Sequence, residues 1–189
     1  MPRHGLVVRV THWVNAIGTL ALIVSGVAIL LAHPRLYWGE TGAVGTPSLI
    51  DLPIPFIFGH SGWGRYLHFL AAWICVGAGL LYVPLQFTKH ALARSYTGAQ
   101  RLSYVLVVFV LGPIVLLSGL AFSPMLASVS PALVSVFGGQ QSARTIHFFA
   151  AAAVVGFLIG HVVMVAASGF TTHMRSMIVG DQRSSMEET

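Results

Sequence analysis

The chain is poor in charged residues and in cysteine. Only 8% of its 189 residues are charged, and Asp and Glu together number five. The single cysteine, Cys75, lies inside an apolar run. A lone cysteine excludes a disulfide framework, a cysteine zinc site and the C-x-x-C-H signature of covalent haem attachment. The sequence also has no phosphate-cradling glycine loop, no G-x-S-x-G elbow and no carboxylate pair, which argues against the hydrolase and nucleotide-binding classes that use them.

Apolar residues dominate instead. They make up 56% of the chain, and the mean hydropathy is +0.81. Such a composition is too apolar for a soluble domain and predicts an all-α integral membrane protein in contact with lipid. The formal net charge of +5 comes without a run of like charges or a basic stripe. We therefore attribute the positive charge to the basic residues that orient the spans in the membrane, and we expect no nucleic-acid partner.

Four apolar runs predict a single four-helix transmembrane bundle over residues 1–189. The expected spans are about 10–32, 64–87, 102–126 and 144–168. The first run is longer than the apolar region of a signal peptide, so it is interpreted as a span. Pro113 should kink the third. An outer loop over 33–63 and a cytoplasmic tail over 171–189 complete the expected organisation.

Basic residues predict the orientation of these spans. The side that carries both termini holds Arg3, Arg9, Lys89, Arg94, Arg101, Arg175 and Arg183. The opposite side holds only Arg35, Arg65 and Arg144. The positive-inside rule then predicts cytoplasmic N- and C-termini in a bacterial cytoplasmic (inner) membrane.

Four histidines fall at two depths in the predicted spans. His12 and His161 lie toward the cytoplasmic side, and His68 and His147 toward the outer side. On a helix, His147 and His161 are separated by roughly 21 Å of rise and about four turns, so they point to nearly the same side. A zinc or copper site needs three or four ligands at one level, whereas two axial imidazoles suit a haem iron. Two pairs, His12 with His161 and His68 with His147, are therefore predicted to ligate two haems and to favour electron transfer.

An arginine precedes three of these histidines by one helical turn. Arg9, Arg65 and Arg144 each start an R-x-x-H unit, which puts both residues on one helix face. The repeated unit supplies an iron ligand and a cation for a haem propionate. His60 is an alternative ligand. The other histidines are interpreted as solvated flanking residues: His4, His33, His90 and His173.

These segments resemble the prokaryotic cytochrome b561 family, which includes the b-type cytochrome subunits of nickel-iron hydrogenases. The likeness covers nearly the whole chain and rests on R-x-x-H-W at Arg9, R-x-x-H at Arg65, H-x13-H from His147, and Leu-Ser-Gly-Leu-Ala-Phe-Ser-Pro. The stretch 33–40 is more similar to thiosulfate reductase-type cytochrome b subunits, which often accompany periplasmic molybdopterin oxidoreductases. The resemblance implies His12, His68, His147 and His161 as haem b ligands.

The predicted function is that of a membrane cytochrome with two stacked b-type haems. It would transfer electrons between a periplasmic redox partner and the quinone pool. This role is that of an electron-transfer subunit of a quinone-linked oxidoreductase, which the sequence favours over a stand-alone enzyme. One alternative is a self-sufficient superoxide:quinone oxidoreductase, with Arg35, Arg65 and Arg144 attracting the anion. Another is a haem-free membrane anchor or a histidine proton-relay transporter. The sequence does not determine where quinone binds, in which direction electrons flow or whether the chain forms a homodimer.

Overall fold

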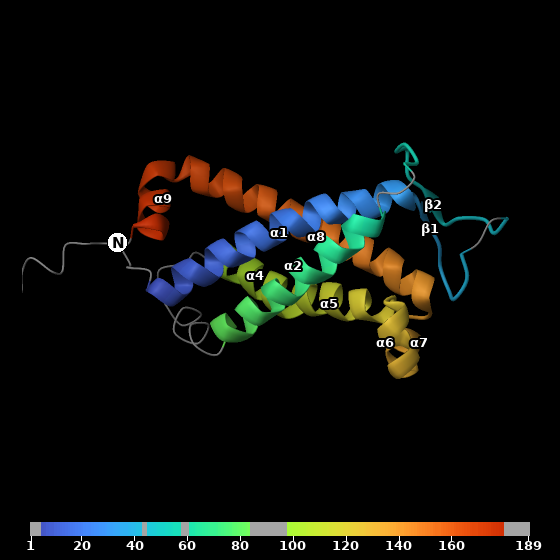
Figure 1. Cartoon of the computed structure of the whole chain (residues 1–189). Helices are drawn as coiled ribbons and strands as arrows, with labels where there is room; N and C mark the ends of the chain where they lie inside the picture. The colour runs from blue at the N-terminus through green and yellow to red at the C-terminus, as the bar shows by residue number, and fades with distance from the viewer. Residues whose placement is uncertain (1–4, 43–44, 58–60, 84–97, 180–189) are drawn as a thin grey trace, which may run out of the picture. The chain divides into compact units, whose positions relative to one another are not determined.

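The computed structural model describes residues 5–42, 45–57, 61–83 and 98–179. Within them, four stretches are long and apolar enough to cross a membrane: Leu6–Ala32, Gly62–Tyr82, Leu102–Ala121 and Gln140–Ala167. Figure 1 follows them along the chain from α1 (Leu6–Ala32), in blue, through α2 (Ser61–Tyr82) to α8 (Gln140–Ala167), in orange. The prediction of a helical membrane protein with four spans is confirmed.

Some residues used for the sequence predictions lie outside the described part of the chain. They are Arg3, His4, His60, Lys89, His90, Arg94, the last part of the second predicted span, 84–87, and the last part of the predicted tail, 180–189, which includes Arg183.

The chain divides into two compact units, each assembled from separate stretches. The first comprises Met1–Ile29, Gly59–Ser95 and Gly160–Thr189, and the second comprises Leu30–Phe58 and Tyr96–Ile159. The interpretation of the chain as a single domain stays a prediction.

Small residues bring α1 and α2 close together in the first unit. A Cβ added to Gly64 would lie 3.3 Å from Ala28 Cβ, from a side-chain carbon of Ile29 and from the Ser25 carbonyl oxygen. A Cβ on Gly18 would lie 2.4 Å from Cys75 Sγ. Helices in a membrane pack where small residues allow close backbone approach, and these two glycines do that.

The third span, in the second unit, contains an interruption just before its proline. It consists of α4 (Gly98–Leu106), the π-helical turn η2 (Val107–Leu111) and α5 (Gly112–Ala121). Pro113 has no backbone N–H and its ring would crowd the carbonyl one turn earlier. A wider π turn ahead of it relieves that crowding. The irregularity predicted from Pro113 thus takes the form of a π turn.

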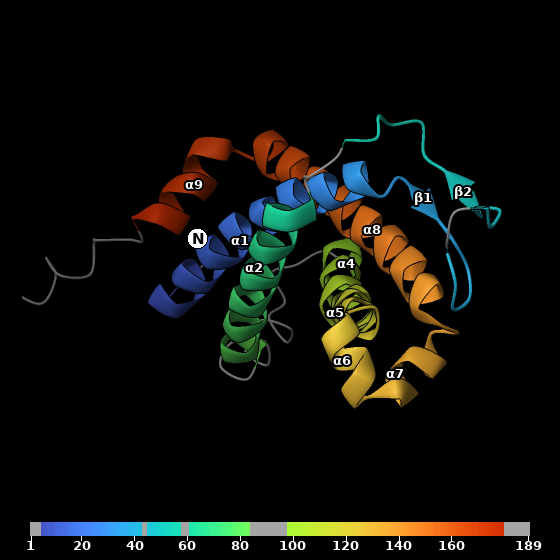
Figure 2. The same cartoon turned by 45° about the vertical axis from the view of Figure 1, so that its right-hand side comes forward.

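Two short helices follow α5, where the sequence predicted the end of the third span, up to about residue 126, and then a connection. α6 (Pro124–Val129) and α7 (Pro131–Val136) each begin with a proline preceded by a serine. Proline suits the first helical position because its missing N–H would have no helical partner there. Figure 2 shows α7 leading to the N-terminal end of α8.

The outer loop forms a small hairpin that is attached to the start of α8. β1 (Arg35–Leu36) pairs antiparallel with β2 (Ile50–Asp51). The Gly39 carbonyl accepts hydrogen bonds from the amides of Gln141 (3.0 Å) and Ser142 (3.3 Å), which satisfies donors that a helix start leaves open. Ser142 Oγ accepts in turn from the Gly39 amide at 2.7 Å. The hairpin and the first turn of α8, beside each other in Figure 2, therefore form one structure.

Replacing Gly139 by alanine should break this attachment. Gly139 has φ of +112°, and an added Cβ would lie 2.3 Å from the Gly39 carbonyl oxygen. Gly45→Ala is a matched control, since Gly45 also has a positive φ (+91°) but no atom within 4 Å of an added Cβ. The control should lose about 1–2 kcal/mol from backbone strain alone. Gly139→Ala should lose clearly more in thermal unfolding in detergent, with faster proteolysis of the hairpin; equal losses would contradict the clash.

Candidate functional site

The imidazoles of His12 and His161 face each other in the first unit. His12 comes from α1 and His161 from the last part of α8. Their ring centroids are 6.5 Å apart, with an interplanar angle of 53°. Two imidazoles on opposite sides of one iron, each with a nitrogen about 2 Å from the metal, have ring centres about 6 Å apart. The observed separation therefore fits a metal between the rings, and the ligand roles themselves stay predictions.

The C-terminal end of a third helix, α9 (Phe170–Ile178), is hydrogen-bonded to α1 close to His12. Arg9 Nε donates to the Met177 carbonyl at 3.4 Å, and Arg9 also donates to the Ile178 carbonyl. Trp13 Nε1 donates to the Met177 carbonyl at 3.1 Å. These carbonyls end α9, within the predicted polar tail. A helix C-terminus has open carbonyls and partial negative charge, which attract a guanidinium. Arg9 is thus observed to bind the end of α9, and its binding of a haem propionate stays a prediction.

Removing the Arg9 guanidinium should loosen α9. Arg9→Gln should speed amide hydrogen exchange in α9 about tenfold, because hydrogen bonds from a charged donor are lost. Arg175→Gln removes the same charge from an exposed side chain in the last turn of α9 and should have a smaller effect, because it loses only a solvent-screened interaction with the helix end. Unchanged exchange in Arg9→Gln, together with loss of haem, would instead favour the propionate role.

In the same unit, α1 supports the ring of His68 on α2. Ser25 Oγ lies 2.9 Å from His68 Nδ1, and the Leu22 carbonyl accepts a hydrogen bond from the ring. A Cβ added to Gly26 would lie 3.7 Å from His68 Cε1. The stretch 22–26 therefore forms a surface against which this imidazole rests.

In the second unit, α5 supports the ring of His147 on α8 in a similar way. His147 Nδ1 lies 2.9 Å from the Val115 carbonyl oxygen and 3.3 Å from Ser118 Oγ. A Cβ added to Gly119 would lie 3.1 Å from His147 Cε1. The Phe122 ring meets the imidazole edge-on, with centroids 5.5 Å apart. His68 and His147 belong to different units, so their pairing at one iron stays a prediction.

The supporting serines were missed by the sequence predictions. A signal was present, because Leu-x-x-Ser-Gly at Leu22–Gly26 matches Val-x-x-Ser-Gly at Val115–Gly119. The two copies lie on different spans, however, and serine in an apolar helix commonly bonds to its own backbone.

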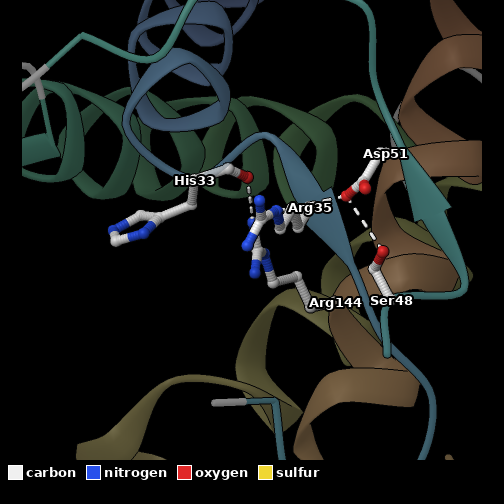
Figure 3. A network of polar contacts seen from close by, with 5 residues as sticks. All are labelled: His33, Arg35, Ser48, Asp51 and Arg144. Carbon is white, nitrogen blue, oxygen red and sulfur yellow. Dashed lines mark hydrogen bonds and ion pairs between the residues drawn. The ribbon is translucent and has the colours of Figure 1, made fainter. Parts of the chain in front are cut away.

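The arginines of the outer side have varied surroundings. Arg65 is exposed. Figure 3 shows Arg144 donating to the His33 carbonyl and Arg35 paired with Asp51. The Arg35 Nε to Asp51 Oδ1 distance is 3.3 Å, and Ser48 donates to the same carboxylate oxygen at 2.9 Å. Arg35 and Arg144 thus both hold the outer hairpin, a role that the R-x-x-H pattern did not predict for Arg144.

Comparisons with known proteins agree with the motifs. The family model described as prokaryotic cytochrome b561 matches residues 3–180. A curated relative, the putative protein-methionine-sulfoxide reductase subunit YedZ1 of Azospira oryzae, is 28% identical over 191 residues, which covers 84% of this chain and 87% of the relative. No solved structure matches the chain.

Proposed function

Because this chain belongs to the prokaryotic cytochrome b561 family, we propose that it carries electrons across the bacterial cytoplasmic membrane through two b-type haems. Family membership and the relative support a membrane b-type cytochrome that transfers electrons to or from a partner. The observation that carries the proposal of a bound haem is the facing pair His12 and His161, with centroids 6.5 Å apart.

Each pair of histidines has one task in this proposal. His12 and His161 hold the inner iron, and His68 and His147 hold the outer one. A haem held by two of these imidazoles would supply one-electron transfer and not oxygen activation. The apolar spans around the histidines keep water from the path, and Arg65 and Arg144 are proposed to balance propionate charge near the outer surface.

The proposed partners differ at the two ends. A periplasmic oxidoreductase, by resemblance one of the molybdopterin class, would dock on the outer side, and membrane quinone would exchange electrons with the chain. The relative named as a reductase subunit supports a partner of this general kind. Cytoplasmic termini follow from the distribution of arginine and lysine.

The proposal is tested by the haem content of the protein purified in detergent. A dithionite-reduced minus oxidised spectrum with pyridine haemochrome quantitation should give two b-type haems per chain. One haem would refute one of the two histidine pairs. A colourless preparation would refute the proposal and favour the anchor or proton-relay alternative.

The same preparation distinguishes a subunit from a self-sufficient enzyme. An electron-transfer subunit should reduce quinone only when a reduced partner protein is supplied. Quinone reduction by superoxide alone would instead establish the superoxide:quinone oxidoreductase alternative. The engagement of Arg35 and Arg144 in the hairpin weakens the support that this alternative takes from those two residues.

A further inference from the structure

Ser25 and Ser118 contact the imidazoles of His68 and His147, respectively, in the same way. In the first unit, Ser25 Oγ lies 2.9 Å from His68 Nδ1, and in the second, Ser118 Oγ lies 3.3 Å from His147 Nδ1. Both serines are fully buried. In each case a glycine follows the serine and lies against the imidazole ring.

Both serine hydroxyls have a carbonyl oxygen of the preceding helical turn as their acceptor. Ser25 Oγ donates to the Ala21 carbonyl at 2.6 Å, and Ser118 Oγ donates to the Ile114 carbonyl at 2.5 Å. A hydroxyl has one hydrogen, so each Oγ presents only lone pairs to the ring beside it. The hydrogen between Oγ and Nδ1 must therefore belong to Nδ1.

A second acceptor leads to the same conclusion independently. The Val115 carbonyl lies 2.9 Å from His147 Nδ1, and the Leu22 carbonyl accepts from the His68 ring. A carbonyl oxygen cannot donate, so Nδ1 of His147 again carries the hydrogen. A neutral imidazole protonated at Nδ1 has its lone pair at Nε2, the atom available to a metal.

From this arrangement we infer that Ser25 and Ser118 are positioning residues for the outer haem. They hold His68 and His147 in the tautomer and ring orientation that present Nε2 to iron. A hydrogen bond from Nδ1–H makes the imidazole a more basic ligand, which favours ferric iron and lowers the reduction potential. This inference rests on the proposed function, because it assigns both histidines to a haem.

The test is a potentiometric titration of the two haems in Ser25→Ala and Ser118→Ala. Each variant should raise the outer potential, with a threefold to tenfold change in the ratio of reduced to oxidised haem, or about 30–60 mV for one electron. The inner potential should stay unchanged. Ser25→Ala should have the larger effect, because Ser25 Oγ is closer to its imidazole Nδ1 (2.9 Å) than Ser118 Oγ is (3.3 Å).

Two further variants make the result specific. Ser135→Ala is the control, since the Ser135 hydroxyl also donates to its own helix, at the Pro131 carbonyl, and this change should leave both potentials unchanged. Ser25→Thr retains an oxygen that bonds to the preceding turn in the same way, and it should keep the native potential.

Each outcome then decides the inference. An unchanged or lowered outer potential in both alanine variants, with two haems still bound, would overturn it and leave the proposed function intact. If Ser25→Ala binds no outer haem, Ser25→Thr decides: a native potential supports the inference, and a shifted potential or lost haem overturns it. Absence of haem from the unsubstituted protein would instead refute the proposed function.

Discussion

Replacing His161 by alanine is expected to lower the haem content from two per chain to one. His161 and His12 face each other at 6.5 Å between ring centroids, so removal of either ring leaves the proposed inner iron with a single protein ligand. Pyridine haemochrome quantitation of the purified variant measures the loss directly. Electron transfer across the membrane should fall by more than tenfold, because the remaining outer haem reaches only part of the way.

Two controls separate ligand loss from general damage. His173→Ala removes an exposed imidazole on α9, whose Nε2 lies 3.2 Å from Ser168 Oγ. This variant should keep both haems. The double variant His12→Ala with His161→Ala should bind as much haem as either single variant, since partners in one site are not additive. An unchanged haem-to-protein ratio in His161→Ala would refute this ligand pair.

The second large effect is expected from Gly119→Val, which should remove the proposed outer haem. A Cβ at this position would already lie 3.1 Å from His147 Cε1 and 3.2 Å from Nδ1. Valine adds two methyl groups to that Cβ, and a packed interior cannot absorb them without moving the imidazole. His147 would then lose both its contact with the Val115 carbonyl and its orientation toward iron. The spectrum and the haem content should both report the loss.

Alanine variants at Gly119 and at the equivalent Gly26 test whether haem loss increases with the severity of the steric clash. Gly119→Ala should weaken the outer haem partly, because 3.1 Å is too short for an ordinary contact. Gly26→Ala should be tolerated, because its Cβ would lie 3.7 Å from His68 Cε1. Gly79→Val controls for a β-branched residue in a span, since no atom lies within 4 Å of an added Cβ there. Equal haem content in all four variants would contradict a steric role for Gly119.

The spans were predictable because membrane insertion depends on local composition. Every run of apolar residues long enough to cross a bilayer became a helix in the described residues, and the π turn lies just before Pro113. The short helices α6, α7 and α9 were missed because they are too short for a hydropathy signal. Their start signals, Ser123-Pro124 and Ser130-Pro131, were visible but ambiguous between a turn and a helix.

The histidines were predictable for a related reason, while their supports were not. A polar residue inside a span needs a functional explanation, so His12 and His161 stood out from the apolar sequence around them. Ser25 and Ser118 did not, because a serine in a helix can satisfy its own hydroxyl. Arg9 was interpreted as a signal of membrane orientation and as a cation for a haem propionate, whereas its observed partners lie in α9 at the other end of the chain.

The sequence by itself determined the class of the protein and the number of its spans, and it predicted which residues would bind haem. These properties follow from hydropathy, helical period and the chemistry of single side chains, all of which are local along the chain. Only the tertiary structure decided which carbonyl lies beside Nδ1 of His147, what Arg9 and Arg144 bind, and how the hairpin joins α8. Those outcomes depend on the register between helices, which is set by packing among residues far apart in the sequence.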